Sequence, residues 1–110
     1  MTLSARLQTL PERILKGVFY FDPSDGIYKD HFPGNPVVPG SLIVNAFMEA
    51  GKSAGFNGNK LILKGFRFKK FISPGKYAYR IELIQDQMKC KLFETDSNSM
   101  ETVVTGTIKI

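Results

Sequence analysis

Hydrophobic and polar positions follow two different periods along this chain. Apolar residues recur at the three- and four-residue spacing of one helix face at Leu42, Ile43, Ala46, Phe47, Ala50 and Ala54. Ser41 is a suitable N-cap and Gly55 a suitable end, so the pattern predicts a helix over 41–54. The only charged residues in this segment are Glu49 and Lys52. Such low charge indicates a helix that is largely wrapped by protein.

The rest of the chain favours strands. Residues 17–21 are rich in β-branched and aromatic side chains, and apolar and polar residues alternate over 60–71, 77–84, 88–92 and 102–110. Turn-forming residues at 73–75, 85–87 and 96–99 separate these segments. One helix followed by antiparallel strands predicts an α+β fold, with the helix packed on one face of a strongly curved sheet. The edge strands of such a sheet stay exposed, and pairing two of them in a dimer is one way to cover them.

Two further segments precede the helix. Residues 1–16 carry leucines at helical spacing interrupted by Pro11, which indicates a short helix or an ordered N-terminal arm. Residues 22–26 (Asp-Pro-Ser-Asp-Gly) form a strong turn signal, after which we expect Ile27 and Tyr28 to resume strand pairing. The aspartates at 22, 25 and 30 lack the glycine and closing glutamate of a calcium loop, so we interpret them as turn and surface residues.

Length and composition limit the class of protein. With 110 residues, of which 43% are hydrophobic, we expect a single folded domain over 1–110. No apolar run approaches the ~20 residues that span a bilayer, and the N-terminus lacks an apolar signal core. We therefore expect a cytoplasmic protein without a membrane partner. The single cysteine, Cys90, excludes an intramolecular disulfide and a cysteine-based metal cluster, and its alternating strand indicates a small core residue. We expect no metal ion and no cofactor.

The net charge of +5 leaves two interpretations open. It is compatible with ordinary solubility. It also favours an acidic partner, such as a nucleic acid, an acidic carrier protein or a nucleotide-bearing thioester. Charge alone does not choose between these partners.

The segment just before the helix is the most unusual part of the sequence. His31-Phe32-Pro33-Gly34-Asn35-Pro36-Val37-Val38-Pro39-Gly40 contains the only histidine and three of the six prolines. Prolines and glycines fix a backbone that an ordinary loop does not hold, and the loop ends where the predicted helix begins. A rigid loop that carries a titratable group at a helix start is more often functional than a simple connector. A purely structural histidine is the alternative.

This loop and the start of the helix closely resemble the 3-hydroxyacyl-[acyl-carrier-protein] dehydratase family of hotdog-fold proteins. The resemblance rests on His31-Phe32-Pro33-Gly34, on Pro36 to Gly40 and on Leu42-Ile43. A weaker similarity follows in residues 65–75, where Arg67-Phe68 and Pro74-Gly75 match a family strand and its end. The resemblance covers the chain from about Val18 onward, whereas the N-terminal arm does not look like the usual start of the family.

The resemblance implies a hotdog fold that works as a homodimer, or as a hexamer of such dimers, with acyl-carrier protein as partner. It implies that His31 takes the proton next to the thioester carbonyl and that the backbone N–H of Gly40 polarises the thioester oxygen. Phe32, Pro39 and Ser41 then contact the substrate. Free N–H groups and the partial positive charge of a helix start suit a developing enolate oxygen, and histidine titrates near working pH.

One position departs from the family pattern. The carboxylic acid that protonates the leaving hydroxyl, contributed by the other subunit, falls at Asn45, and an amide cannot donate a proton in this way. Glu49 stands where the family usually has glutamine, one helical turn beyond Asn45 and on the same face. If it is buried, a raised pKa would keep it protonated, as an acid requires. A solvated or salt-bridged glutamate is the alternative.

Basic residues gather in the strand after the helix at Lys64, Arg67, Lys69 and Lys70. An exposed strand face is the simple interpretation, and docking of an acidic carrier protein and its phosphopantetheine phosphate is the functional one. Aromatics interleave with these charges as in nucleic-acid-binding strands. Core packing explains Phe66, Phe68 and Phe71 better, so we expect no nucleic-acid partner.

Three hypotheses for function follow. The first is a dehydratase that converts a 3-hydroxyacyl thioester of acyl-carrier protein into the trans-2-enoyl thioester. The second is a non-catalytic or assisting hotdog subunit, which binds acyl chain or carrier protein or forms a heterodimer with an active paralogue that supplies the acid. The third is a hotdog acyl thioesterase in which Asn45 holds a water. Fatty-acid, polyketide and polyene synthesis all use domains of this family, and the sequence does not choose between them.

Overall fold

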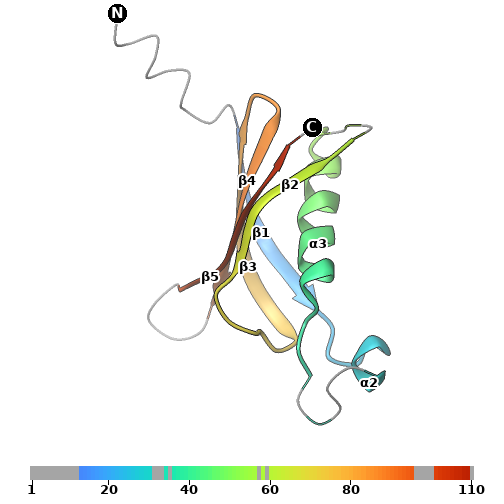
Figure 1. Ribbon diagram of the computed structural model, residues 1–110. Coiled ribbons are helices and arrows are strands. Elements are labelled where there is room, and N and C mark those ends of the chain that lie inside the picture. The colour runs from blue at the N-terminus through green and yellow to red at the C-terminus, as the bar shows by residue number, and fades with distance from the viewer. Residues whose placement is uncertain are drawn as a thin grey trace, which may run out of the picture.

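The computed structural model describes residues 13–30, 34, 36–56, 58, 60–95 and 101–109 (Figure 1). Its elements in chain order are β1 (Arg13–Phe21), α2 (Ile27–Asp30), α3 (Gly40–Ser53), β2 (Ile62–Phe68), β3 (Gly75–Ile84), β4 (Gln87–Glu94) and β5 (Thr102–Lys109). The predicted turn over 96–99, the arm up to residue 12 and Ile110 lie outside the described residues.

The strands form one five-stranded sheet in the order β1-β3-β4-β5-β2, and every neighbouring pair is antiparallel. Strands β3, β4 and β5 follow one another through the middle of the sheet, while β1 and β2 form its edges. Helix α3 runs along one face of the sheet (Figure 1). The predicted α+β architecture, with one long helix on a curved antiparallel sheet, is therefore confirmed.

The core lies between α3 and the inner face of the sheet. On the helix, Ile43, Phe47 and Gly51 are buried at a spacing of four residues. On the sheet, the buried residues include Tyr77, Ile81 and Leu83 of β3 and Met88, Cys90 and Leu92 of β4. A Cβ atom at Gly51 would run into the thioether of Met88, so a glycine is needed where the helix approaches β4. These strand faces and the buried Cys90 agree with the predicted alternation.

The opposite face of α3 is exposed. Asn45, Glu49 and Lys52 all lie there, together with Ser41 and Ser53. The other residues of α3 are buried or half-buried, so most of the helix is covered, as predicted.

Three element boundaries differ from the sequence prediction. Strand β1 begins at Arg13 rather than Gly17, because Arg13 already pairs with Leu83. The Arg13 guanidinium also donates a hydrogen bond to the Ala54 carbonyl oxygen at 2.8 Å. Residues 27 and 28 belong to the short helix α2 instead of a strand, because the Asp25 carboxylate accepts a hydrogen bond from the Ile27 N–H at 3.1 Å, as a helix cap does. The N-cap of α3 is Pro39 and not Ser41, with no side-chain capping bond.

Strand β2 contains an irregularity that the alternating pattern does not reveal. Gly65 has a φ of +60°, and the pairing with β5 shifts register between Lys64 and Arg67. Phe66 packs inward against Gly106 and Phe47, as predicted. The prediction of core packing is wrong for Phe68 and Phe71, whose exposed fractions are 44% and 85%.

Within the part of the chain that the structure describes, no helix is long and apolar enough to cross a membrane.

Burial of Cys90 leads to a pH-dependent prediction. Burial raises the pKa of the Cys90 thiol from 9.0 to about 12, so the unfolded chain loses this proton first as the pH rises. The contribution to stability is complete below about pH 9 and is lost progressively toward about pH 12. Urea denaturation across this range should show a steeper fall in the free energy of unfolding for the wild type than for Cys90→Ala. Equal slopes would contradict the burial of the thiol.

Candidate active site

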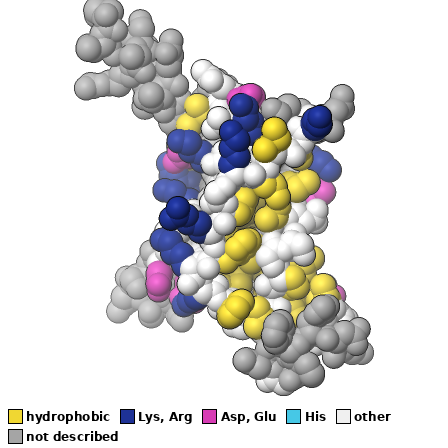
Figure 2. All heavy atoms as spheres, in the orientation of Figure 1, with side chains coloured by type: hydrophobic (Ala, Val, Ile, Leu, Met, Phe, Trp, Pro, Cys, Tyr) yellow, Lys and Arg dark blue, Asp and Glu magenta, His cyan; other side chains and the backbone are white. Residues whose placement is uncertain are grey.

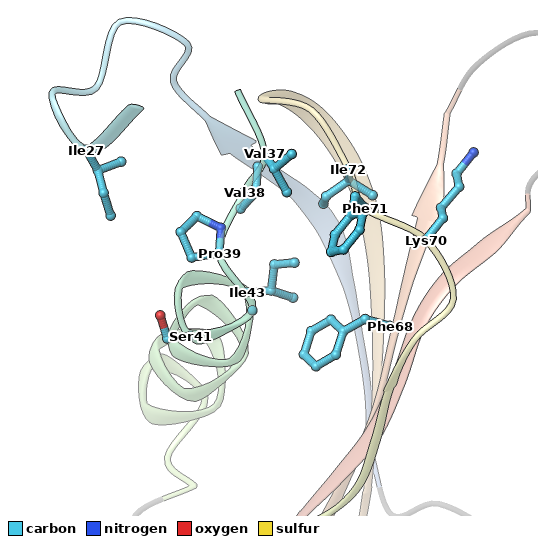
Figure 3. A pocket seen from close by; sticks show the side chains of 11 residues that line it. Ile27, Val37, Val38, Pro39, Ser41, Ile43, Phe68, Lys70, Phe71 and Ile72 are labelled. Atoms are coloured by element: carbon cyan, nitrogen blue, oxygen red, sulfur yellow. The ribbon is translucent and has the colours of Figure 1, made fainter. Parts of the chain in front are cut away.

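A cavity of about 420 Å³ opens beside the first turn of α3 (Figure 3). Its walls come from α2, the segment before α3, the first turn of α3 and the segment that follows β2. The lining residues are mostly apolar: Ile27, Val37, Val38, Pro39, Gly40, Ser41, Ile43, Phe68, Lys70, Phe71 and Ile72. Its volume and lining suit the burial of a small apolar group or chain.

A backbone hydrogen bond fixes two walls of this cavity relative to each other. The N–H of Val38 donates to the carbonyl oxygen of Ile72 at 2.9 Å, and both side chains are buried. This bond joins the proline-rich segment before α3 to the chain just after β2. The prolines at 36 and 39 therefore act together with a tertiary contact in holding the helix start against the sheet.

The start of α3 faces the cavity with free donor groups. The N–H groups of Leu42 and Ile43 donate to the Pro39 carbonyl oxygen at 3.0 and 3.3 Å, so those of Gly40 and Ser41 lie ahead of the hydrogen-bonded ladder. The partial positive charge of the helix start adds to these donors. Such a site can bind a carbonyl oxygen that gains negative charge during a reaction.

Gly40 also sets how closely β2 approaches the helix. A Cβ atom at this position would lie 3.1 Å from the tip of the Phe68 ring. Phe68 reaches toward the first turn of α3 from the end of β2, as Figure 3 shows. The lack of a side chain at residue 40 therefore lets the aromatic ring pack closely at this side of the cavity.

Of the predicted site residues, Pro39, Gly40 and Ser41 line the cavity, whereas Asn45 and Glu49 do not. Asn45 and Glu49 lie on the exposed face of α3. Ser41, at the start of the same face, lines the cavity. The Glu49 side chain is 63% exposed, and its carboxylate lies 3.7 Å from the ammonium of Lys52. Within one chain, Glu49 is therefore exposed and paired with a cation, which corresponds to the salt-bridged alternative.

The four predicted docking cations do not form one cluster. Lys70 lines the cavity and its ammonium lies 2.6 Å from the Glu94 carboxylate, which raises the pKa of Lys70. Lys64 and Arg67 pair in register with Thr107 and Thr105 of β5, on the face of the sheet opposite α3. Lys69 is exposed, and its N–H donates to the Val103 carbonyl oxygen at 2.8 Å.

His31 and Phe32 lie outside the described residues, so their proposed roles rest on the sequence. Among the described residues, no group of three His, Cys, Asp or Glu side chains could hold a metal ion.

Sequence reasoning missed several lining residues, chiefly Phe68, Phe71 and Ile72. For Phe71 and Ile72, the sequence signal was their position directly before the Ser73-Pro74-Gly75 turn, where the strand pattern ends.

The comparisons with known proteins indicate a dehydratase-like protein of the hotdog class. The chain matches the model of the ApeI-like family, described as ApeI dehydratase, over residues 8–107, and it belongs to that family. It is 30% identical over 102 residues to a 3-hydroxyacyl-[acyl-carrier-protein] dehydratase FabZ of Herpetosiphon aurantiacus, covering 86% of this chain and 67% of that protein. The FabZ of Chloroflexus aggregans is 36% identical over 70 residues, covering 56% of this chain and 48% of the relative.

Among solved structures, the dehydratase heterocomplex ApeI:P from Xenorhabdus doucetiae superposes with a TM-score of 0.70 at 17% identity, covering 89% of this chain and 87% of that one. This likeness confirms the hotdog fold. The chain spans about half the length of the first curated relatives that it matches.

The contact between Gly40 and Phe68 predicts a mild effect of substitution. In Gly40→Ala, only the tip of a half-exposed ring has to move, so we expect the free energy of unfolding to change by less than about 1 kcal/mol. In Gly106→Ala, the new methyl group meets the root of the partly buried Phe66 ring, so we expect a loss of roughly 1–3 kcal/mol. Urea denaturation of both variants measures the difference. Equal losses would contradict this account of the two glycines.

Proposed function

We propose that this protein dehydrates 3-hydroxyacyl thioesters carried on acyl-carrier protein, giving trans-2-enoyl thioesters. The main support is the pair of N–H groups at Gly40 and Ser41, which lie ahead of the helix ladder at an apolar cavity. In the sequence, residues 35–39 separate them from the His-Phe-Pro-Gly segment. The FabZ names of the relatives supply the substrate class.

In this mechanism the acyl chain lies in the apolar cavity and the thioester carbonyl oxygen accepts a hydrogen bond from the Gly40 N–H. The imidazole of His31 removes the proton from the carbon next to the carbonyl, and the electron pair moves onto the oxygen as an enolate. The enolate then collapses to form the double bond while the bond to the β-hydroxyl breaks. The hydroxyl leaves as water when it receives a proton.

Two residues of α3 bear on the source of that last proton. Asn45 can orient the hydroxyl through its amide but has no carboxylic proton to give. Glu49 carries a carboxyl group one turn further along α3, but in one chain it is exposed and next to Lys52. Either Glu49 is enclosed by a second chain, or a partner chain supplies the acid.

A second chain is also favoured by exposed apolar surface. Strand β2 is an edge of the sheet, and Ile62, Leu63, Phe68 and Phe71 are all more than two-fifths exposed, at 46%, 51%, 44% and 85%. Figure 2 shows hydrophobic side chains gathered along the middle of the molecule, over the region between β2 and α3. We propose that β2 of a second chain pairs here, which covers the unpaired edge and brings the exposed face of α3 toward the neighbouring site.

A specific observation also favours an assisting role. In a homodimer both chains carry Asn45, so neither offers a carboxylic acid at that position. The neighbour from Xenorhabdus doucetiae is a dehydratase heterocomplex, ApeI:P. A heterodimer in which a paralogue supplies the acid is therefore the second candidate function.

The chemistry predicts the following kinetics. Incubation with 3-hydroxybutyryl- and 3-hydroxydecanoyl-carrier protein should give enoyl absorbance without free thiol, and His31→Ala should abolish it. Asn45→Asp restores an acid and should raise the rate, by up to roughly 10²–10⁴-fold. Glu49→Gln should remove the remaining activity if Glu49 is the acid, while Lys52→Gln, which breaks the same ion pair, should not.

The other outcomes separate the alternatives. Free thiol without enoyl product would indicate a thioesterase and contradict the proposal. Saturable binding without turnover, followed by turnover when an acid-bearing paralogue is added, would indicate the assisting role. Activity that survives Glu49→Gln would exclude Glu49 as the substitute acid.

The proposed pairing through β2 predicts the effect of a charge at that edge. Leu63→Asp should convert a dimer into a monomer in sedimentation velocity, because it places a charge in the apolar contact, and dehydration should be lost with it. Val18→Asp is the matched control, since Val18 is 58% exposed on the other edge strand. A dimer that tolerates Leu63→Asp but not Val18→Asp would place the contact at β1 instead.

A further inference from the structure

The outer face of the sheet, opposite α3, carries a row of cations that crosses all five strands. The pairing register aligns Lys16 of β1 with Arg80 of β3, Arg80 with Lys91 of β4, and Lys91 with Thr105 of β5, which pairs with Arg67 of β2. Four of the five positions in this row are positively charged. The sequence does not reveal this row, because its members lie far apart along the chain.

A second row lies beside the first. Glu82, Lys89, Thr107 and Lys64 face one another across β3, β4, β5 and β2. With Lys76 and Lys109, the cations that share this face among the described residues are Lys16, Lys64, Arg67, Lys76, Arg80, Lys89, Lys91 and Lys109. The acid found with them is Glu82, which pairs with Arg80 at 3.0 Å. Figure 2 shows Lys and Arg side chains gathered on the sheet side of the molecule. We call this surface the basic face.

The bulge in β2 contributes to the basic face. A regular strand places residues 64 and 67 on opposite sides, whereas the extra residue at Gly65 puts Lys64 and Arg67 on the same one. Like charges directly opposite each other across strands oppose sheet pairing. The Lys16–Arg80–Lys91 alignment therefore does not stabilise the sheet. An anionic surface that covers these cations would offset their mutual repulsion.

The basic face has a hollow of about 430 Å³ that offers donors from several sides. Lys64 borders it on β2, while Lys89 and Lys91 border it on β4. Between them, Thr105 and Thr107 of β5 add hydroxyl groups. Ammonium and hydroxyl donors around a shallow opening suit a phosphate group that approaches from outside.

Apolar side chains border the basic face along β1. Val18 and Tyr20 are 58% and 59% exposed and share the side of β1 that Lys16 occupies. Cations beside exposed aliphatic and aromatic groups are typical of protein surfaces that rest on a bilayer, where the charges meet headgroups and the apolar groups enter the boundary.

We propose that the basic face binds the surface of an anionic phospholipid bilayer. The cations extend in two dimensions over five strands, as contact with an extended surface requires. The cavity lies on the other side of the sheet, next to α3, so bilayer contact leaves it accessible. An acidic carrier protein fits this face less well, because it has to deliver its acyl chain to the cavity. The proposal departs from the expectation of no membrane partner, which rested on the lack of an apolar span; peripheral contact needs none.

Vesicle co-sedimentation tests the proposal without any thioester substrate, so its result is independent of the proposed function. The full chain should bind phosphatidylglycerol–phosphatidylcholine vesicles and not pure phosphatidylcholine vesicles, and added salt should weaken binding. Lys91→Glu should weaken it by at least about fivefold, since each cation near an anionic bilayer contributes about that factor. This variant faces Arg80, so the sheet should remain folded. Lys52→Glu, the same charge change on the exposed face of α3, should have little effect.

Three results would overturn the proposal. The first is no binding to anionic vesicles at low salt. The second is an equal loss in Lys91→Glu and Lys52→Glu, which would indicate net charge rather than the basic face. The third is a raised KM of Lys91→Glu for carrier-linked substrate, while the KM for a short soluble thioester is unchanged and the wild type does not bind vesicles. This combination would assign the basic face to the carrier protein.

Discussion

The packing of α3 against the inner face of the sheet is the contact on which the rest of the structure depends. Ile43 and Phe47 are almost completely buried there, and Gly51 lets the helix approach Met88. Because this contact uses one face of α3, it fixes which residues point away from the sheet. Asn45 and Glu49 lie on that other face, so their chemistry depends on whatever covers the helix from outside. The same packing that stabilises the chain thus leaves both residues on the uncovered side of the helix.

The start of the helix shows how backbone geometry and tertiary contact cooperate. Pro39 ends the extended segment and Gly40 begins the helix, which leaves two N–H groups unpaired within the helix. The hydrogen bond between Val38 and Ile72 holds this helix start against the end of β2. Donors that are already oriented need no rearrangement when charge develops on a bound oxygen. The cavity therefore combines apolar walls with a fixed polar end.

Strand β2 separates two surfaces of opposite character. On its inner side Phe66 joins the core and Phe68 closes the cavity, while on its outer side Lys64 and Arg67 join the basic face. The bulge at Gly65 makes this division possible, because it changes the alternation within the strand. As an edge of the sheet, β2 pairs with β5 on one side only.

The sequence by itself determined the elements and the candidate chemistry. Local periodicity and turn residues sufficed for the helix, the strands that follow it and the buried alternation of β3 and β4. The His31–Gly40 motif sufficed for the family resemblance. Tertiary structure decided the rest. Phe71 looked like a core residue but is exposed, since alternation does not show where a sheet ends. Glu49 faces solvent because only one side of α3 is covered. The row from Lys16 to Arg67 arises from strand register, which depends on contacts between segments far apart in the chain and is invisible to local patterns.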